Sequence, residues 1–375
     1  MGERIVVLVT DAFGGRGGIA LYNRHFLRAV CSHPDVNEVV ALPRVISYAL
    51  EPMPANLRFE TWSTGSKLRY GQAVAALAAR PGSAALVVCS HLSLLPFAHV
   101  LSTRYRCPTL PLVYGIEAWS SYPNAMVSAL TRRIKVFVSI RKLTAERLRR
   151  WAGIPDARFH YLPNCIDLAS FGPGLKRLDL VAKYGLAGRT VVMTAGRLDD
   201  TIYERNKGFE EVLGALPGLA EEVPDVTYLV MGDGNHRPRL EGIARTLGVA
   251  NRVVFSGYVP EADKADHYRL ADVVAMPGSN PVFDRYPYRF AFLEPLACGV
   301  PVVGARLDEP SERDDPDAAR LVIQVDPNDA ADIRRGIREG LARRRDGVDP
   351  LLKKFSFPAF EKSAHAILSA EMRAR

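Results

Sequence analysis

Short runs of apolar, mostly β-branched residues alternate along the whole chain with longer segments of helical periodicity. This alternation is typical of βαβ units, in which the strands pair in parallel and helices cover the sheet. The same alternation of strands and helices begins again in the second half of the chain, so it predicts two doubly wound, Rossmann-like α/β domains. The predicted strands are Ile5–Val9, Val39–Leu42, Ala85–Cys89, Thr109–Val113, Val136–Ser139, Phe159–Leu162, Thr190–Thr194, Thr227–Met231, Arg252–Phe255, Val273–Met276, Pro301–Val303 and Leu321–Val325. Ligands of such sheets bind outside the carboxyl ends of the strands, so two facing domains predict one deep cleft.

The boundary between the two predicted domains lies near the segment Asp167–Lys176, where glycine and proline interrupt the apolar periodicity. We predict an N-terminal domain over residues 1–168 and a C-terminal domain over residues 169–357. The final helix, residues 358–375, is expected to pack back on the first domain. Asn328 is the predicted N-cap of the preceding helix.

The composition is that of an ordinary globular protein, because 48% of the 375 residues are hydrophobic and 24% are charged. It excludes a disordered chain, a fibrous repeat and a disulfide scaffold. The five cysteines are scattered and form no Cys-x-x-Cys pair, so we expect free thiols in the cytoplasm and no zinc site. The segment Pro81–Thr103 lacks charged side chains, but prolines, histidines and a glycine interrupt it. It is interpreted as a buried strand followed by a short helix rather than a membrane span.

The formal net charge of +8 is distributed unevenly. The segment Arg132–Arg150 contains eight basic residues and a single acidic one, Glu146. This basic segment has three interpretations: a solvated helix face, a nucleic-acid patch, or a surface that contacts anionic lipid. The segment lacks interleaved aromatic residues and a recognition motif, which argues against nucleic acid.

Glycines follow the first predicted strand of each domain, where a parallel sheet would bind its ligand. In the first domain the turn runs from Gly14 to Gly18, and such a turn lets backbone N–H groups approach an anion. In the second domain Gly196 and Arg197 follow the first strand, and Lys207 stands just before the next predicted helix. A guanidinium and an ammonium at one sheet edge are suited to neutralising a diphosphate.

Together these motifs resemble the retaining, nucleotide-sugar-dependent glycosyltransferases of family 4, of the bacterial polysaccharide and glycolipid type, whose fold is called GT-B. The similarity extends over nearly the whole chain. It lies in Gly17-Gly18-Ile19, Leu162-Pro163-Asn164-Cys165-Ile166-Asp167 with Phe171, Gly196-Arg197-Leu198 with Lys207-Gly208, Met231-Gly232-Asp233-Gly234, Phe255-Ser256-Gly257-Tyr258, Tyr268 with Ala271-Asp272-Val273, and Glu294 through Val303.

The resemblance implies roles for individual residues on the donor side. Arg197 and Lys207 would hold the diphosphate and stabilise the leaving group. Glu294 would accept hydrogen bonds from the two ribose hydroxyls. The remaining residues predicted to line the donor site are Gly17, Gly18, Gly196, Gly232, Tyr258, Asp284, Tyr286, Arg289 and Phe290.

The sequence departs from the family pattern before Glu294. The glutamate that contacts the transferred sugar in the family is Tyr286 here, and the glycine that leaves room for phosphate is Arg289. Asp284 is the nearby acid that could substitute for the missing glutamate. The identity of the sugar therefore stays open.

On the acceptor side, Tyr114 and Glu117 lie in a segment that resembles the family's His-Gly-x-Glu motif, with tyrosine in place of histidine. A tyrosine hydroxyl can donate a hydrogen bond to the sugar or the acceptor, but its ordinary pKa near 10 makes it a poor base. Glu117 would orient the acceptor hydroxyl.

The resemblance implies a hexosyltransferase that moves a sugar from GDP-mannose or a UDP-hexose to a glycan, a glycolipid or a small molecule. Neither a cofactor nor a metal is implied, because Arg197 and Lys207 supply the positive charge; the Asp-x-Asp spacing at Asp315 and Asp317 is interpreted as a solvated turn. The alternatives are a degenerate GT-B protein that binds nucleotide without turnover, and a GT-B epimerase or phosphorylase. We expect a cytoplasmic protein, with peripheral contact at the inner face of the cytoplasmic membrane through Arg132–Arg150.

Overall fold

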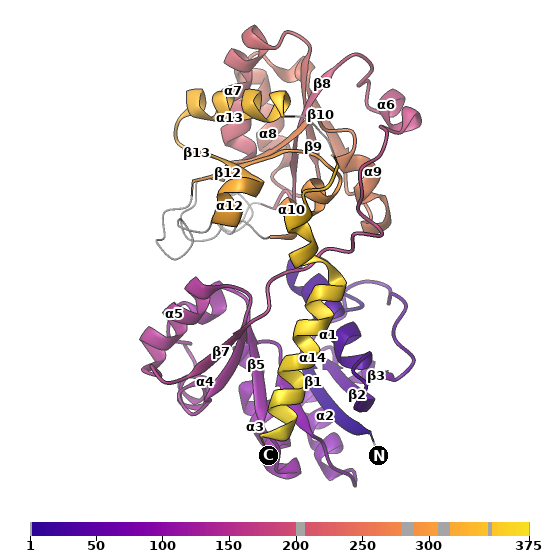
Figure 1. Ribbon diagram of the computed structural model, residues 1–375, viewed down its shortest axis with the longest axis vertical. Helices are drawn as coiled ribbons and strands as arrows, with labels where there is room; N and C mark the ends of the chain where they lie inside the picture. Colours follow the sequence, from indigo (N-terminus) through magenta and orange to yellow (C-terminus); the bar gives the residue numbers. More distant parts are fainter. Residues whose placement is uncertain (1, 200–206, 279–288, 307–315, 344–346, 375) are drawn as a thin grey trace. The chain divides into compact units, whose positions relative to one another are not determined.

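The computed structural model describes residues 2–199, 207–278, 289–306, 316–343 and 347–374 (Figure 1). The chain divides into two compact units. The first comprises residues 1–165 and 357–375, and the second comprises residues 166–356. The segment predicted as the linker, Asp167–Lys176, lies within the second unit, where Ile166 forms an isolated parallel bridge with Ser356.

The first unit contains a seven-stranded parallel sheet in the order β3-β2-β1-β4-β5-β6-β7. Its strands are β1 (Glu3–Val9), β2 (Val36–Pro43), β3 (Leu57–Phe59), β4 (Leu86–Cys89), β5 (Thr109–Val113), β6 (Val136–Ser139) and β7 (Arg158–Tyr161). Its helices are α1 (Gly18–Cys31), α2 (Lys67–Ala79), α3 (Leu95–Tyr105), α4 (Ala125–Thr131), α5 (Lys142–Ala152) and α14 (Phe357–Arg373). Three short 3-10 turns join them: η1 (Thr61–Ser63), η2 (Leu92–Leu94) and η3 (Ile116–Ala118).

The second unit contains a six-stranded parallel sheet in the order β10-β9-β8-β11-β12-β13. Its strands are β8 (Thr190–Ala195), β9 (Val226–Met231), β10 (Val253–Gly257), β11 (Val273–Met276), β12 (Val302–Ala305) and β13 (Val322–Val325). Its helices are α6 (Leu178–Lys183), α7 (Phe209–Glu222), α8 (Arg237–Thr246), α9 (Lys264–Tyr268), α10 (Phe290–Ala297), α12 (Pro316–Leu321) and α13 (Ala330–Ala342). The 3-10 turns η5 (Ala250–Arg252), η6 (Glu261–Asp263) and η7 (Pro350–Phe355) complete it.

In both sheets the strand order reverses beside the first strand of the unit. The reversal lies between β1 and β4 in the first unit and between β8 and β11 in the second. The prediction of two doubly wound, Rossmann-like units is therefore confirmed. In folds of this kind, ligands bind outside the carboxyl ends of the strands at such a reversal.

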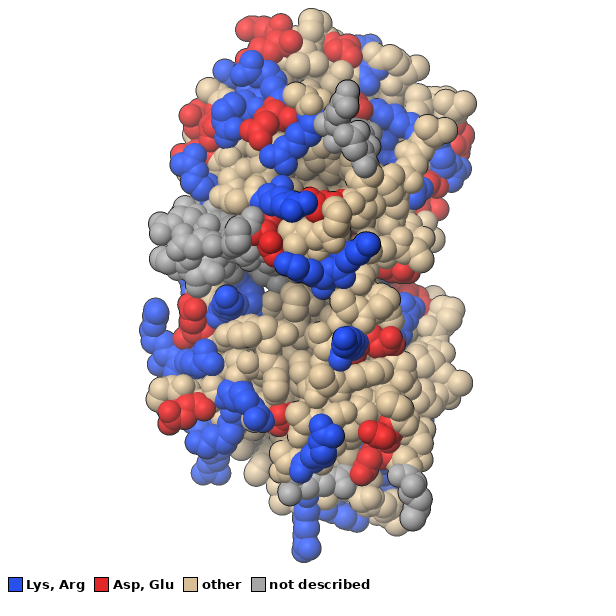
Figure 2. All heavy atoms as spheres, in the orientation of Figure 1, with Lys and Arg blue, Asp and Glu red and all other residues tan. Residues whose placement is uncertain are grey.

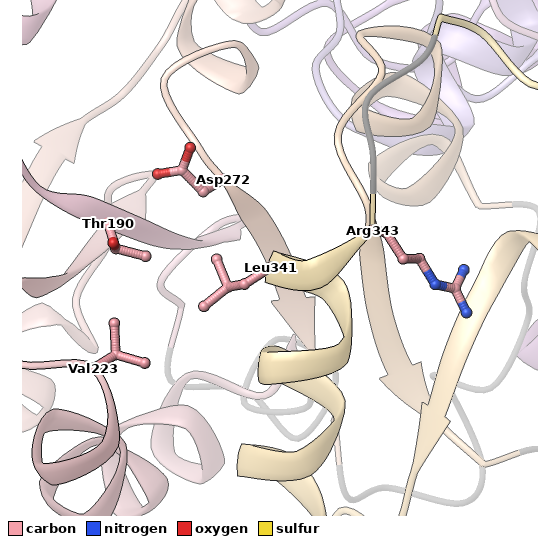
Figure 3. A pocket seen from close by; sticks show the side chains of 5 residues that line it. All are labelled: Thr190, Val223, Asp272, Leu341 and Arg343. Atoms are coloured by element: carbon pink, nitrogen blue, oxygen red, sulfur yellow. The ribbon is translucent and has the colours of Figure 1, made fainter.

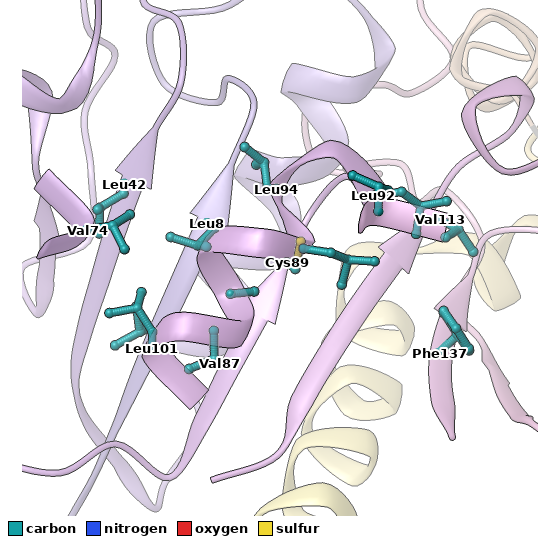
Figure 4. Packing of buried hydrophobic residues seen from close by; sticks show 14 of the residues in the cluster. Leu8, Leu42, Val74, Val87, Cys89, Leu92, Leu94, Leu101, Val113 and Phe137 are labelled. Atoms are coloured by element: carbon teal, nitrogen blue, oxygen red, sulfur yellow. The ribbon is translucent and has the colours of Figure 1, made fainter. Parts of the chain in front are cut away.

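Buried apolar side chains fill the space between the first sheet and its helices (Figure 4). Leu8 and Val87 from the sheet pack with Leu101 of α3 in one continuous cluster. Phe137 of β6 is fully buried and stacks on Phe159, with 5.0 Å between the ring centroids. The strand and short helix predicted within Pro81–Thr103 are β4 and α3, and both belong to this core.

The final helix α14 packs along α1 of the first unit, as Figure 1 shows. Phe360 makes an edge contact with Tyr22 at 5.6 Å between the ring centroids. His365 hydrogen-bonds through Nε2 to the carbonyl oxygen of Ala29 at 2.9 Å, and Ser32 donates its hydroxyl proton to Glu361 at 2.6 Å. The chain thus returns to the first unit after completing the second.

Two local features differ from the predictions. The three-residue strand β3 was not predicted, because it is short and only partly buried at the edge of its sheet. The N-cap of α13 is Asp329, whose carboxylate accepts the backbone N–H of Ala331, rather than Asn328. All five cysteines are free thiols. No helix among the described residues is long and apolar enough to cross a membrane.

Replacement of the buried Phe137 by alanine removes a stacked ring from the core. We expect Phe137→Ala to lower the free energy of unfolding by about 3–5 kcal/mol, because large cavities in cores cost this much. The exposed Leu68 of α2 provides the control, and Leu68→Ala should change stability by less than about 0.5 kcal/mol. Urea unfolding followed by circular dichroism measures both values. Equal midpoints for the two variants would contradict the described packing.

Candidate active site

The loops that follow β8, β9 and β10 are joined by backbone hydrogen bonds at the carboxyl edge of the second sheet. The Gly196 N–H donates to the Met231 carbonyl at 2.9 Å, and the Leu198 N–H donates to the Asp233 carbonyl at 2.9 Å. An isolated bridge joins Gly232, the residue after β9, to Gly257, the last residue of β10. The three loops therefore form one continuous platform beside the strand-order reversal.

Small residues allow this platform to close. Gly232 has a φ of +146°, and a Cβ there would overlap the carbonyl oxygen of Gly196. Any larger residue at Gly232 would push the β8 and β9 loops apart. At Gly208 a Cβ would lie 2.6 Å from the backbone nitrogen of Pro277, which follows β11. The β11 loop is thus packed against the start of α7.

Lys207 and Arg197 both stand at this edge. The stem of Lys207 lies against Gly196, because a Cβ on that glycine would be 3.1 Å from Lys207 Cγ. Arg197 comes two residues after the end of β8, and its side chain is 62% exposed. Its Nη1 is 3.8 Å from a carboxylate oxygen of Asp199. The structure therefore places the two predicted diphosphate ligands at the carboxyl end of one strand.

Glu294 lies one turn into α10 and is 2% exposed. The Tyr268 hydroxyl donates to Oε2 at 2.7 Å, and Lys264 Nζ lies 3.4 Å from Oε1. Burial raises the pKa of Glu294, whereas Lys264 and the Tyr268 hydrogen bond oppose that rise. The carboxylate is therefore held in a defined orientation by two side chains of α9.

The other predicted donor residues occupy different environments. Tyr258 follows β10 and is half exposed, and Phe290 is buried as the first residue of α10. The Arg289 guanidinium donates from Nη2 to the Met276 carbonyl at 3.2 Å and lies 4.0 Å from the centroid of the Phe292 ring. Arg289 is thus folded back on the end of β11. Asp284 and Tyr286 lie outside the described residues.

The glycine loop of the first unit leads into α1. Gly17 is the N-cap of that helix, with a φ of +92° that suits glycine, and no side chain caps the helix there. Gly18 is its exposed first residue. The buried Arg24 donates from Nη1 to the Ala12 and Gly15 carbonyls at 3.2 and 3.0 Å, and pairs with Glu51 at 3.0 Å. The loop before Gly17 is therefore fixed by α1 itself.

Tyr114 and Glu117 follow β5, but their polar groups are engaged within the protein. The buried Tyr114 hydroxyl donates to Asn23 Oδ1 at 2.6 Å, and burial raises its pKa well above the ordinary value. Because the hydroxyl proton is already donated to Asn23, this geometry does not support the expected hydrogen bond from Tyr114 to a sugar or acceptor. The Glu117 carboxylate accepts the backbone N–H groups of Tyr114 and Gly115 at 2.5 and 3.0 Å. Glu117 thus fixes its own turn.

Sequence reasoning missed several polar residues near these edges. Asn23 joins two loops, since its Nδ2 donates to the Asp11 carbonyl at 2.8 Å while Oδ1 accepts from Tyr114. His91 follows β4, where burial lowers its pKa and the Glu117 charge opposes that shift. His91 could have been found from the sequence, because it lies two residues after the predicted strand Ala85–Cys89. For Asn23 and Lys264 no such signal exists, because they lie in helices.

The described residues also line a cavity of about 260 Å³ in the second unit (Figure 3). Thr190 starts β8 and Asp272 precedes β11, so this cavity lies at the amino ends of the strands. Val223, Leu341 and Arg343 complete its lining. It lies at the opposite edge of the sheet from Arg197 and Lys207. Among the described residues no group of three or more His, Cys, Asp or Glu side chains could hold a metal ion. Asp317, from the Asp-x-Asp spacing, accepts a hydrogen bond at Oδ2 from Lys354 Nζ at 2.9 Å.

Residues 189–343 match the family model described as Glycosyl transferases group 1. The chain is 34% identical over 197 residues to a GDP-mannose-dependent alpha-(1-6)-phosphatidylinositol monomannoside mannosyltransferase of Mycolicibacterium smegmatis, a match covering 50% of this chain and 49% of the relative. It is 34% identical over 222 residues to a D-inositol 3-phosphate glycosyltransferase of Xylanimonas cellulosilytica, covering 56% and 50%. The chain spans about half the length of these curated relatives.

Solved structures resemble the chain over its whole length. The structure of Alr3699/HepE from Anabaena in complex with UDP-glucose superposes with a TM-score of 0.71. The similarity covers 98% of this chain and 100% of that one, at 17% sequence identity. At this identity the likeness establishes the fold, which is that of the GT-B glycosyltransferases.

A substitution at Gly232 tests how the platform is closed. We expect Gly232→Ala to lower the free energy of unfolding by about 1–3 kcal/mol, since its Cβ meets the Gly196 carbonyl and its φ is unfavourable for alanine. The matched control is Gly214→Ala in α7, where a Cβ meets nothing within 4 Å. That change should raise stability by about 0.5–1 kcal/mol. Thermal or urea unfolding of both variants measures the difference in sign, and a stabilising Gly232→Ala would refute the contact.

Proposed function

We propose that this protein is a hexosyltransferase that uses a nucleotide-diphosphate sugar, because residues 189–343 match the model of the group 1 glycosyltransferases and the chain has the GT-B fold. The observation that carries the proposal is the placement of Arg197 and Lys207 beside Gly196 at the carboxyl edge of β8. Two cations at the crevice of a doubly wound sheet suit a diphosphate.

The donor would lie along the platform formed by the β8, β9 and β10 loops. Arg197 and Lys207 neutralise the negative charge that develops on the diphosphate as the sugar bond breaks, and this is the largest electrostatic demand of the reaction. Glu294 accepts hydrogen bonds from the ribose hydroxyls. Gly196 and Gly232 let the β8 and β9 loops and the Lys207 stem pack closely, and Tyr258 is exposed after β10.

We propose transfer with retention of configuration and without a nucleophile from the protein. The acceptor hydroxyl attacks the face from which the diphosphate leaves, and an oxygen of the β-phosphate takes its proton. This differs from retaining glycosidases, which require two carboxyl groups at a set separation. The role assigned to the protein is to hold the diphosphate and orient both substrates. Positive charge comes from Arg197 and Lys207, so the proposed mechanism assigns no step to a metal.

The names of the relatives guide the choice of substrates to be tested. One relative is GDP-mannose-dependent and acts on a phosphatidylinositol mannoside, and a structural neighbour is in complex with UDP-glucose. We propose GDP-mannose or a UDP-hexose as donor, and a hydroxyl of a glycan, a lipid-linked sugar or a small molecule as acceptor. Binding of nucleotide without turnover on any acceptor would instead indicate a degenerate GT-B protein.

The proposed phosphate ligands can be tested by mutation. We expect Arg197→Ala and Lys207→Ala each to lower kcat by about 10²–10³-fold, which is typical for removing one group that stabilises developing charge. Arg189→Ala is the control, because Arg189 is exposed next to the opposite end of the same strand. Thermal-shift measurements with UDP, GDP and their sugars first identify the donor, and release of nucleoside diphosphate then gives the rate. Unchanged rates in both variants would refute the proposed site.

We further propose that the protein contacts the membrane surface through the exposed basic residues of the segment Arg132–Arg150. Arg132, Arg133, Lys135, Lys142 and Arg150 are exposed. Arg147 instead lies 4.3 Å from the Trp119 ring centroid, and Arg149 donates from Nη2 to the Ala157 carbonyl at 3.2 Å. Figure 2 shows basic side chains over the part of the first unit where α4 and α5 lie. A lipid-linked acceptor would be met at such a surface.

Vesicle co-sedimentation tests this contact. The protein should bind anionic vesicles at low salt, and replacement of Arg132, Arg133, Lys135 and Lys142 by glutamine should weaken binding by about fivefold per charge, because each contributes about 1 kcal/mol. Neutral vesicles and Arg189→Gln are the controls. Equal binding to neutral and anionic vesicles would show that the segment is only a solvated face.

A further inference from the structure

We propose that Lys264 is a positioning residue that keeps the Glu294 carboxylate ionised and oriented to receive the ribose hydroxyls of a nucleoside diphosphate. The inference rests on the proposed function, because that function assigns Glu294 to the ribose. Lys264 itself belongs to none of the motifs that carry the family resemblance. The contact on which the inference depends is the 3.4 Å approach of Lys264 Nζ to Glu294 Oε1.

Glu294 needs such a partner because of where it lies. Its side chain is 2% exposed, and an isolated carboxylate at that depth would be protonated rather than charged. A protonated carboxyl group loses one of the acceptors required to receive two hydroxyl protons. The Tyr268 hydroxyl supplies one stabilising hydrogen bond at Oε2. Lys264 supplies the only countercharge recorded for Glu294 among the described residues.

Lys264 is itself held between two carboxylates. Its Nζ lies 2.9 Å from Glu261 Oε2 and 3.4 Å from Glu294 Oε1. Burial opposes the charge on Lys264, but the two carboxylates raise its pKa above the ordinary value. Glu261 is 42% exposed at the rim, whereas Glu294 is buried. The ammonium therefore links a surface acid to the buried one and stays charged over the whole physiological range.

The elements packed around Glu294 carry several titratable groups. Asp263 is the last residue of η6, Asp266 of α9 pairs with Arg177 and Arg269, and His267 of α9 hydrogen-bonds to Tyr184. Glu261 of η6 and Lys264 and Tyr268 of α9 act on it directly, and Cys298 lies just after the end of α10. The strand β12 carries no titratable side chain, and Lys353 and Lys354 of η7 are exposed. Loss of Lys264 would leave Glu294 with the repulsion of Glu261 and the single bond from Tyr268. The pKa of Glu294 would then rise further, so the carboxylate would be lost at a higher pH than in the wild type.

The test compares a nucleoside diphosphate with its 2′,3′-dideoxy analogue, which cannot donate to Glu294. Calorimetry with GDP and UDP identifies the base that binds, and the ratio of affinities for the hydroxylated and dideoxy forms isolates the ribose contact. We expect a ratio of about 10²–10⁴ in the wild type, the range for two hydrogen bonds to a charged group. The ratio also cancels the titration of the diphosphate itself, which both ligands share.

In Lys264→Met this ratio should start to fall at a higher pH than in the wild type, because Glu294 has lost its countercharge and is protonated more readily. Below the pKa of Glu294 it should decrease by about tenfold per pH unit until the dideoxy value is reached. The midpoint should lie at least about one pH unit above that of the wild type. Lys264→Arg should restore the wild-type profile, because it keeps the charge. Glu261→Gln should leave the ratio unchanged, since the contact between Lys264 and Glu294 remains.

A second variant guards against simple loss of folding in Lys264→Met. The double variant Lys264→Met with Glu294→Gln has no unpaired buried charge, and it should be folded by circular dichroism with a ratio below that of the wild type that does not change with pH, because the amide oxygen still accepts but does not titrate. A wild type that binds neither GDP nor UDP would refute the proposed function. A wild type with a clear ratio, together with Lys264→Met showing the same ratio and the same pH profile, would overturn the role of Lys264 alone.

Discussion

Parallel strand pairing is the constraint on which the rest of this molecule depends. Every strand of each sheet points the same way, so all the loops that follow strands emerge at one edge. Buried apolar side chains pack on each sheet, so the loops at the carboxyl edge are where polar side chains can meet a ligand. Hydrogen bonds between the Gly196, Gly232 and Gly257 loops then convert separate turns into one surface. Arg197 and Lys207 have defined positions because this surface holds the ends of their loops.

Much of the fold could be predicted from hydrophobic patterning, because buried parallel strands are nearly uniform apolar runs. Thr109–Val113, Val136–Ser139 and Val273–Met276 have the predicted bounds. Patterning failed where burial was partial, as in β3, and where two adjacent residues could both cap a helix, as at Asn328 and Asp329. In the site, residues directly after strands could be found from the sequence. Asn23 and Lys264 could not be found in this way. Asn23 contacts Tyr114, which is 91 positions away, and Lys264 contacts Glu294, which is 30 positions away.

Charge in this protein is used in two distinct ways. Arg24 and Arg149 satisfy backbone carbonyls, and Arg289 and Arg147 lie over aromatic rings, so their cations stabilise local structure. Counting basic residues in the sequence could not separate these from the exposed ones. The same distinction applies to acids, because Glu117 fixes a turn while Glu294 is oriented by two side chains of a neighbouring helix. The role of a charged residue therefore follows from what its head group contacts.

The second unit is inserted within the first, and the two ends of the insertion lie side by side. Ile166 donates its N–H to the Phe355 carbonyl at 2.7 Å and bridges to Ser356. Across the break, Cys165 Sγ lies 3.2 Å from His25 Nδ1, and the ring of Phe357 lies 5.8 Å from that of the same histidine. A cut at both points would leave neither unit with distant loose ends. The second unit therefore leaves and rejoins the first at adjacent points, so replacing the whole unit would still leave the first sheet and α14 in one chain.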